Sequence, residues 1–537
     1  MSEEYVPVLI VGGGIAGLTA ALLLQHHGVG AVLAEKHAGT SPQPKARRFN
    51  PRSNEVFRAL GLSEEIAEAG APLAKFTGML TGPTLAEATW PEMTPQLTAA
   101  AVQHAELARL SPAPSVLCPQ DVLEPVLRRA AEARGARLRF GTELVAVKQD
   151  ADGVLAELRP ADGEPYTVVA DYLIAADGAR SPIRESLGIP RTGAGHLADN
   201  LDVCFRADLA ELVRGKEFNL CRIENPAASG AFVSVNGTDV WLFSTSDFPV
   251  GDRRARDLGD EEWASLLREV IGVSDVDIEI LSKMPWESGM YVAERFAEGR
   301  VFLAGDAAHA MPPMAAAGAN TAIADVANLT WKLAAVLAGN APATLLDSYH
   351  AERYPIGYAT AAFSSQVSGH LGTMLKAITS GDTQRADIGA TMFGVQYPEG
   401  AFVADDRGPS PEDHYAPGAR PGTRIPHAWL GRDGDQVSTL DLVGPGFALL
   451  TGPDGEAWQR AAAEVTAESG LTVEVCRIGT DVTDLSDDDG GWLAAAELTG
   501  TGAVLVRPDA VVAWHSPTCP ERPAEALGKA LSQVLGR

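Results

Sequence analysis

Apolar residues fall in short blocks along the chain, and the spacing of these blocks predicts alternating strands and helices. Residues 6–11 form a mostly β-branched and aliphatic run, which is typical of a buried parallel strand. An apolar helical pattern follows over residues 15–27 and ends at Gly28, and residues 31–34 form a second apolar run. This order predicts the first strand–helix–strand unit of an α/β fold with a parallel sheet.

Further helix and strand patterns continue to about residue 374. Helices are predicted over residues 53–60, 63–69, 122–133, 319–337 and 342–374. Strands are predicted over residues 137–140, 143–149, 153–158, 165–169, 172–176 and 301–304. Residues 72–114 have no sustained period, so we expect them to be irregular.

Residues 187–286 differ in character, because apolar and polar positions alternate over short runs. A hairpin is predicted on either side of Asn236-Gly237, a dipeptide that favours tight turns. We therefore expect an antiparallel sheet inserted into the α/β fold. Phe232, Trp241 and Phe243 are candidates for an apolar lining on this sheet, although aromatic strand residues are more often plain core.

The C-terminal third predicts a separate αβ unit. Residues 381–424 are rich in Pro, Gly and Asp, which suggests a linker. Strands are then expected over residues 447–450, 471–477 and 503–506, with a terminal helix over residues 524–535.

Composition narrows the possible partners. The chain has 537 residues and a net charge of −27, which argues against nucleic acid and anionic membranes as partners. The apolar run at residues 8–24 is broken by four glycines, so a βα unit explains it better than a membrane span. Five cysteines without metal-binding or C-x-x-C spacing, and an acidic N-terminus unlike a signal peptide, predict a cytoplasmic protein without a metal site.

The first strand and helix are joined by a G-x-G-x-x-G motif. Gly12 allows the tight turn, Gly14 lets the backbone approach a pyrophosphate, and Gly17 lets the helix pack on the sheet. Glu35, at the end of the second strand, is placed to accept hydrogen bonds from a ribose. The motif in this context predicts dinucleotide binding; the alternative is an ordinary β-turn-α unit whose glycines serve packing alone.

Two later motifs follow buried strands in the same way. Asp177-Gly178 follows the strand at residues 172–176, and Gly305-Asp306 follows the strand at residues 301–304. Together with the glycine motif, and in this order, they resemble the class A flavoprotein monooxygenases, the FAD-dependent aromatic hydroxylases. The resemblance covers residues 6–357, and it implies that the glycine, D-G and G-D motifs all contact FAD.

The resemblance also implies a domain organisation. A Rossmann-like FAD-binding domain would comprise residues 1–186 and 287–380, interrupted by a substrate-binding antiparallel sheet at residues 187–286. After the linker, residues 425–537 look like the thioredoxin-like domain of the larger members, which include phenol hydroxylases and aromatic polyketide hydroxylases. It has no C-x-x-C, so a dithiol redox role is excluded. A structural or homodimer-forming role is the better interpretation.

Particular residues take cofactor-binding roles by this resemblance. They are Gly12, Gly14, Ile15, Ala16, Gly17, Glu35, Lys36, Lys45, Arg47, Gln120, Val145, Asp177, Asp306, Pro313, Gly318, Ala319 and Asn320. Asp306 would bind the ribityl chain, although an Asp there is also a good helix cap. The helix opened by Gly318–Asn320 would place its positive end at a flavin ring that becomes anionic on reduction, although it also reads as a simple helix start.

The sequence departs from the family at several of these positions. Lys45 stands where an Arg is common, and with Arg47 it also fits a merely solvated basic loop. Ala315, Ala316 and Ala322 stand where glycines are usual. Their methyl groups disfavour positive φ, so we expect either a slightly shifted flavin or a less strained loop.

The implied reaction is aromatic hydroxylation. NADPH or NADH would reduce FAD, O₂ would be captured as a C4a-hydroperoxyflavin, and the distal oxygen would pass to a phenolic carbon. No catalytic acid, base or nucleophile is therefore expected. A flat polycyclic, polyketide-type substrate is the first choice, ahead of a small phenol or a Baeyer–Villiger insertion. A flavin-binding redox sensor that does not transfer oxygen is the alternative from another class.

Overall fold

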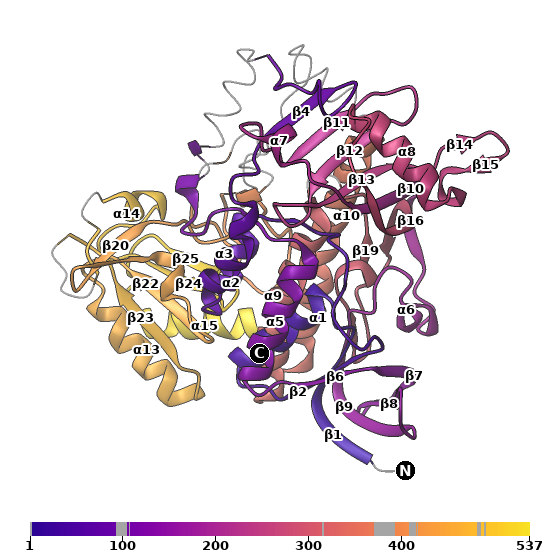
Figure 1. The fold of residues 1–537 in the computed structure, drawn as a ribbon. Coiled ribbons are helices and arrows are strands. Elements are labelled where there is room, and N and C mark those ends of the chain that lie inside the picture. Colours follow the sequence, from indigo (N-terminus) through magenta and orange to yellow (C-terminus); the bar gives the residue numbers. More distant parts are fainter. Residues whose placement is uncertain are drawn as a thin grey trace.

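The computed structural model describes residues 3–92, 105–106, 108–313, 316–369, 392–407, 415, 417–480, 485–487 and 490–537. It contains two large sheets in the first two thirds of the chain and a smaller αβ unit at the C-terminus (Figure 1). Within the described helices, none combines the length and the apolar character needed to cross a membrane.

The first sheet has eight strands and holds the glycine motif. Its central strand, β1 (Glu3–Val11), pairs in parallel with β2 (Ala31–Glu35) on one side and β9 (Tyr166–Ala175) on the other. Further strands extend it: β6 (Arg137–Phe140), β7 (Thr142–Gln149), β8 (Val154–Pro160), β17 (Ala297–Glu298) and β18 (Val301–Leu303). Because β1, β2, β9 and β18 run in parallel, their carboxyl ends lie at one edge of the sheet.

Strand β9 joins two segments that the sequence separates. We predicted strands over residues 165–169 and 172–176, but the structure has one strand that pairs along its length with β1. The interruption in the apolar pattern is Asp171, which accepts a hydrogen bond from the Tyr5 hydroxyl at 2.5 Å. One polar residue facing outward therefore ended the apolar run without ending the strand.

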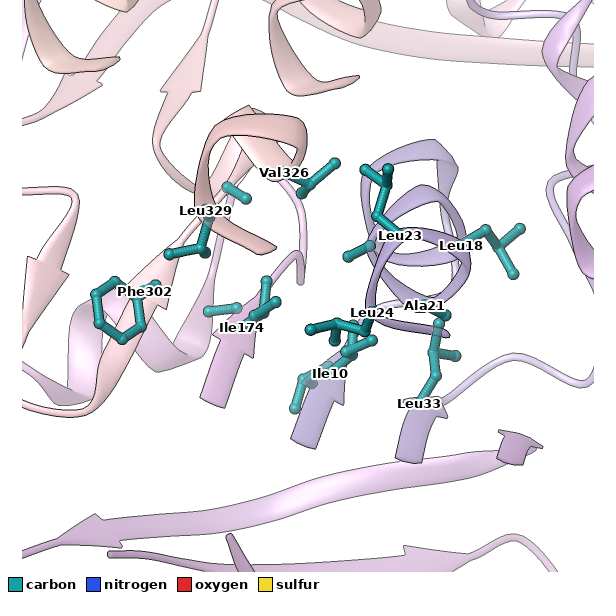
Figure 2. Close-up of a cluster of buried hydrophobic side chains, with 14 of the residues drawn as sticks. Ile10, Leu18, Ala21, Leu23, Leu24, Leu33, Ile174, Phe302, Val326 and Leu329 are labelled. Atoms are coloured by element: carbon teal, nitrogen blue, oxygen red, sulfur yellow. The ribbon is translucent and has the colours of Figure 1, made fainter. Parts of the chain in front are cut away.

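Two helices cover one face of this sheet. Helices α1 (Ile15–His26) and α9 (Ala317–Leu337) contact each other and pack on β1, β2, β9 and β18. Figure 2 shows Leu24 of α1 above Ile10, and Val326 and Leu329 of α9 near Ile174 and Phe302. The core formed in this way fixes where both helices begin, next to the carboxyl ends of the strands.

Four further helices lie close to their predicted positions: α2 (Pro51–Ala59), α3 (Ser63–Gly70), α5 (Gln120–Ala133) and α10 (Asp347–Gly369). The short helix α6 (Pro182–Ser186) was not predicted. The helix predicted over residues 342–374 begins as a 3₁₀ turn, Ala343–Leu346, and its predicted end lies outside the described residues. Strands β3 (Arg48–Phe49) and β5 (Val116–Leu117) form a small antiparallel pair.

The second sheet has seven strands, most of them from the predicted insertion. Their order is β19 (His309–Ala310), β16 (Glu279–Ala293), β10 (Arg191–Arg206), β13 (Val240–Ser246), β12 (Gly230–Ser234), β11 (Leu220–Ile223) and β4 (Met79–Gly82). Strand β4 corrects the prediction that residues 72–114 are irregular. It has four residues and pairs in parallel with the distant β11, so the local sequence has no apolar periodicity that would predict it.

The aromatic residues of the predicted hairpin form a core of their own. Phe232, Trp241 and Phe243 are fully buried on the face of the sheet covered by α8 (Asp260–Ile271). The core interpretation is therefore correct, and these side chains do not line a site. The alternate residues of the same strands, including Leu242 and Ser244, are only half-buried and lie on the opposite face.

The C-terminal unit is built on a four-stranded sheet in the order β23 (Val473–Arg477), β22 (Phe447–Thr451), β24 (Ala503–Val506) and β25 (Val512–Ser516). Helices α13 (Glu456–Ser469) and α15 (Pro523–Leu535) pack on it. The described residues also form shorter elements: α7 (Ala210–Val213), β14 (Pro249–Val250), β15 (Arg253–Arg254), β20 (Trp429–Arg432), β21 (Asp435–Ser438) and α14 (Gly491–Ala495).

Candidate functional site

The turn between β1 and α1 requires its glycines. Gly12 has φ +112°, and a Cβ there would lie 2.1 Å from the Ala176 carbonyl oxygen. A Cβ on Gly17 would lie 1.9 Å from the Gly12 carbonyl oxygen. Gly14 differs, because a Cβ there would meet only the Oε1 atom of Glu124, at 3.6 Å. Gly14 precedes α1, and no side chain caps this helix end, so its first N–H groups have no side-chain acceptor.

Glu35 lies beside this turn, at the end of β2. Its Oε2 atom accepts a hydrogen bond from the Gly13 N–H at 2.6 Å, and its Oε1 atom accepts one from the His37 N–H at 2.9 Å. Lys36 follows it and is exposed. Val145 is also exposed, at a bulge in β7 where the register with β8 shifts. Glu35 thus holds the glycine turn in place while its carboxylate remains at the sheet edge.

Glu124, which was not predicted as a site residue, is buried in the first half of α5. Its Oε1 atom accepts a hydrogen bond from Gln120 Nε2 at 2.6 Å, and its Oε2 atom accepts one from the Ser41 N–H at 2.8 Å. Burial raises the pKa of Glu124, and the Ser41 N–H opposes that rise. An acidic residue among the apolar positions of helix 122–133 was the available signal.

The two basic residues predicted near the cofactor have different environments. The guanidinium of the half-buried Arg47 donates hydrogen bonds to the carbonyl oxygens of Asn219 at 3.2 Å and Ser234 at 2.5 Å. Burial lowers the pKa of Arg47 to about 10. Arg47 therefore joins its loop to the second sheet. Lys45 is exposed, and the main-chain N–H of Gln120 anchors its loop by donating to the Ala46 carbonyl oxygen at 2.7 Å.

Asp177 of the D-G motif works as a local cap. Its carboxylate accepts hydrogen bonds from the Ser181 hydroxyl at 2.7 Å and from the Ile183 N–H at 3.1 Å, at the start of α6. Arg184 is buried and donates to the carbonyl oxygens of Arg180 at 2.7 Å and Ala307 at 3.2 Å. The D-G and G-D loops, far apart in the sequence, are therefore tied together by one side chain.

Asp306 of the G-D motif is exposed, whereas the residues on both sides of it are buried. The short 3₁₀ turn Gly305–Ala307 begins after Ala304 without a side-chain cap, so the helix-cap interpretation of Asp306 does not apply. An accessible carboxylate in a rigid loop at the sheet edge suits binding of hydroxyl groups.

The G-D loop is held from behind by the buried carboxylate of Asp325 on α9. This carboxylate accepts a hydrogen bond from the Gly305 N–H at 3.1 Å and one from Arg353 Nε at 2.9 Å, and its Oδ2 atom lies 2.7 Å from His309 Nε2. All of these groups are buried. The loop that presents Asp306 is thus fixed to α9 by a charged network.

The start of α9 carries the last group of predicted residues. Pro313 is exposed, Gly318 and Ala319 are half-buried in the first turn, and Asn320 is buried. Asn320 Oδ1 accepts hydrogen bonds from the Asn50 N–H at 3.0 Å and from the Ser53 hydroxyl at 2.6 Å. Its side chain therefore ties the start of α9 to the start of α2.

The family glycine positions can be followed in part. Ala315 lies outside the described residues, whereas Ala316 precedes α9 with φ +52° and ψ +34°. The left-handed conformation is therefore present despite the methyl group. Ala322 is buried, and a Cβ on Gly305 would lie 3.2 Å from the Ala322 methyl carbon.

The parts fit a bound dinucleotide. Two helix N-termini, those of α1 and α9, lie at the edge of the first sheet where Glu35 and Asp306 also lie, and the open space at Gly14 admits a close backbone approach by a phosphate. The fold and this edge define a class: a dinucleotide-binding protein with a second, inserted sheet above the cofactor edge.

Comparison with known proteins places the chain within this class. The family model "FAD binding domain" matches residues 5–364, and "Aromatic-ring hydroxylase, C-terminal" matches residues 418–537. The chain is 40% identical to tetracenomycin A2 monooxygenase-dioxygenase of Streptomyces glaucescens, over 100% of this chain and 98% of that protein. The structure of aklavinone-11 hydroxylase with FAD and aklavinone has a TM-score of 0.88 at 33% identity, with 100% of both chains covered. The structure of the flavin-dependent monooxygenase PieE with FAD and substrate has a TM-score of 0.86 at 34% identity, with 99% of both chains covered.

The chain belongs to the FAD-dependent aromatic hydroxylase family. It is a flavoprotein monooxygenase whose cofactor is FAD. The family expectation drawn from the three motifs is confirmed.

Proposed function

We propose that this monooxygenase hydroxylates a polycyclic, polyketide-type phenol, using O₂ and NADPH or NADH. The relatives named above support this substrate class, since their names and structures specify tetracenomycin and aklavinone. The match over both full lengths also supports it, because the inserted sheet and the C-terminal unit are both included.

The observation that carries the proposal is the second face of the inserted sheet. Its first face is a closed aromatic core, but alternate residues on the other face are half-buried, and they include Asp202 and Cys204 of β10 and Leu242 and Ser244 of β13. Ser244 Oγ donates a hydrogen bond to Asp202 Oδ1 at 2.6 Å. A face that combines apolar side chains with a few polar groups suits a flat phenolic ring system.

A loop of the FAD-binding domain connects to this sheet. The loop that carries Lys45 is joined to the sheet through Arg47, and burial raises the pKa of Asp202 while the charge of Lys45 acts against that rise. We therefore assign this face of the sheet to the substrate, with Asp202 and Ser244 as its polar groups.

The protein residues have binding and positioning roles in this proposal. The N–H groups at the start of α1 would hold the diphosphate, Glu35 a ribose, and Asp306 the ribityl hydroxyls. The first turn of α9, from Gly318 to Asn320, would present its positive end to the flavin ring. FAD supplies the chemistry of hydride acceptance and oxygen activation when bound. The two sheets keep water from the reacting atoms.

The test is product formation by the purified protein. The visible spectrum establishes FAD, and NADPH oxidation is then followed with polycyclic phenols and quinones and with simple phenols, using ¹⁸O₂ and mass spectrometry. We expect a polycyclic phenol to stimulate NADPH oxidation and to gain one ¹⁸O atom. Stimulation by simple phenols alone, or FAD binding without oxygen transfer to any compound, would contradict the proposed substrate class.

The proposed role of Asp306 is tested separately by Asp306→Asn. Loss of charge-assisted hydrogen bonds to the ribityl chain should weaken FAD binding about tenfold or more. Asp162→Asn, in an exposed turn after β8, is the matched control and should leave FAD binding unchanged. Equal FAD dissociation constants for the two variants would remove Asp306 from the cofactor site.

A further inference from the structure

The C-terminal unit is joined to the FAD-binding domain by charged side chains at three places. Arg424 pairs with Glu55 of α2, and Arg507 pairs with Glu352 of α10; both pairs are buried. Arg58 of α2 forms a third pair, with Asp441, which is partly exposed. Figure 1 shows the C-terminal unit beside α2 and α3. Two of the three pairs therefore end on the same short helix, α2.

The Arg424–Glu55 pair is the more deeply buried of the two on α2. Arg424 Nη2 donates to Glu55 Oε1 at 2.5 Å, and Arg424 Nε donates to Glu55 Oε2 at 3.1 Å. Glu55 Oε1 also accepts a hydrogen bond from Ser111 at 2.7 Å, and Arg52 binds the same carboxylate. A bidentate pair of this kind fixes orientation as well as distance.

Helix α2, which binds Arg424 of the C-terminal unit, also contacts the start of α9. Ser53 lies two residues before Glu55 on α2, and its hydroxyl, with the Asn50 N–H, binds the Asn320 side chain. Asn50 also caps α2, because its Oδ1 atom accepts the Ser53 N–H at 3.0 Å. The N-terminal half of α2 is thus held by Asn320 on one side and by Arg424 on the other.

We propose that the C-terminal unit positions the flavin-contacting start of α9, with Arg424 as the positioning residue that acts through Glu55 and the first turn of α2. The proposal rests on the assignment of the flavin ring to the start of α9. It gives the C-terminal unit a role in the active site that does not need a dithiol, a metal or a second subunit. Glu55 and Arg424 do not touch the substrate or the cofactor in this proposal.

The pair Arg58–Asp441 provides the matched control. It joins the same helix to the same C-terminal unit through two hydrogen bonds of 2.7 Å, but Arg58 is in the last turn of α2, away from the residues that bind Asn320. If the C-terminal unit only needs to be docked, Arg424→Met and Arg58→Met should have similar effects. If Arg424 positions α9, only Arg424→Met should change the start of α9 and the environment of the flavin.

The first measurement uses the full chain without added FAD. Amide hydrogen exchange in the peptide that covers residues 316–322 should be about tenfold faster in Arg424→Met than in the wild type, because the local anchor is lost. It should be unchanged in Arg58→Met. Arg424→Lys, which keeps the charge but loses the bidentate geometry, should restore part of the protection. This result does not depend on any substrate or on oxygen transfer.

The second measurement uses the FAD-bound enzyme. The visible circular dichroism of the flavin should change in Arg424→Met, and a smaller share of the NADPH consumed should give hydroxylated product. Because Arg424→Met removes the bidentate partner of a buried carboxylate and leaves it only Arg52 and Ser111, the double variant Arg424→Met/Glu55→Gln is measured beside it. Wild-type exchange rates and flavin spectra in both variants, or equal changes in Arg58→Met, would overturn the proposal. A wild-type enzyme that hydroxylates no phenol would instead contradict the proposed function and leave the exchange result standing.

Discussion

Ala316 shows how one methyl group changes the local energetics of the site. A non-glycine residue in the left-handed region costs about 1–2 kcal/mol, and Ala316 has φ +52° directly before α9. The loop keeps this conformation, so the surrounding packing and the Asn320 hydrogen bonds offset the cost. The loop is therefore strained at this residue, and it has not relaxed to suit alanine.

Ala316→Gly should therefore stabilise the protein, although glycine is the more flexible residue. Relief of the left-handed strain, about 1–2 kcal/mol, outweighs the additional entropy cost of glycine, about 0.5–1 kcal/mol. The measurement is the shift in urea unfolding of the protein without FAD. Ala317→Gly, one residue further along and inside the helix, is the control and should destabilise. Destabilisation by both variants would show that Ala316 carries no strain.

Also at the residue scale, the sequence showed which side chains near the site are charged but not where those side chains point. Lys45 and Arg47 are two residues apart in an irregular loop, and the sequence places both near the cofactor. In the structure Arg47 is directed to the carbonyl oxygens of the second sheet, whereas Lys45 remains exposed. No periodicity fixes side-chain direction in such a loop, and the carbonyl partners of Arg47, on Asn219 just before β11 and on Ser234 of β12, follow much later in the chain.

Among the elements, the β1-turn-α1 unit has the strongest sequence signal, and it tolerates added side-chain atoms at its glycines least. Gly17→Ala would place a Cβ 1.9 Å from the Gly12 carbonyl oxygen, and backbone must move to relieve such a contact. We expect a loss of stability of at least about 3 kcal/mol and loss of FAD on purification. Gly39→Ala is the control, because nothing lies within 4 Å of a Cβ there. Retention of FAD by both variants in equal amounts would contradict this account of the motif.

Elements with a sustained local pattern could be predicted, and elements defined by a distant partner could not. Helices α1, α5 and α9 begin and end within three residues of their predicted bounds, because each has a continuous apolar face. Strand β4 has only four residues and exists because β11 pairs with it. The same reason explains why the buried carboxylate of Glu124 was missed, since its hydrogen-bond donor Ser41 lies on another loop.

On the scale of the whole molecule, most of the net charge of −27 is carried at the surface, but several charges meet where the units of the chain join. Glu352 of α10 is the centre of the largest such group. Its carboxylate accepts hydrogen bonds from Arg507 Nη1 at 2.8 Å and Nη2 at 2.9 Å, from the Ala401 N–H at 2.7 Å and from Lys332 Nζ, which lies 3.0 Å away. Residues from α9, α10 and the C-terminal unit are joined by one carboxylate.

This arrangement makes the joint between the units sensitive to acid. Burial acts to raise the pKa of Glu352, but Arg507 and Lys332 outweigh it, and the pKa falls to about 2 from an ordinary value of 4.5. A carboxyl group whose pKa is lower in the folded chain than in the unfolded chain stabilises the fold. This contribution is fully present at pH values above the pKa of the unfolded chain. That contribution is lost as the pH falls from about 4.5 toward 2, and over the full range it amounts to about 3 kcal/mol.

Glu352→Gln should therefore differ from the wild type by an amount that depends on pH. The variant lacks the titrating group and leaves two buried cations, so at pH 6 it should be less stable by about 3–5 kcal/mol. The difference should shrink by about 1.4 kcal/mol between pH 6 and pH 3.5, because only the wild type takes up a proton on unfolding there. Urea unfolding at a series of pH values measures this, with the exposed Glu525→Gln as the control.

The double variant Lys332→Met/Glu352→Gln keeps this prediction testable where the single variant is too unstable to purify. It removes one buried cation together with the carboxylate, so its stability should be closer to that of the wild type, while its dependence on pH should match that of Glu352→Gln. A difference from the wild type that stays constant between pH 6 and pH 3.5 would mean that Glu352 titrates alike in the folded and unfolded chains. The carboxylate would then join the units by packing, and the charges of Arg507 and Lys332 would not hold it ionised.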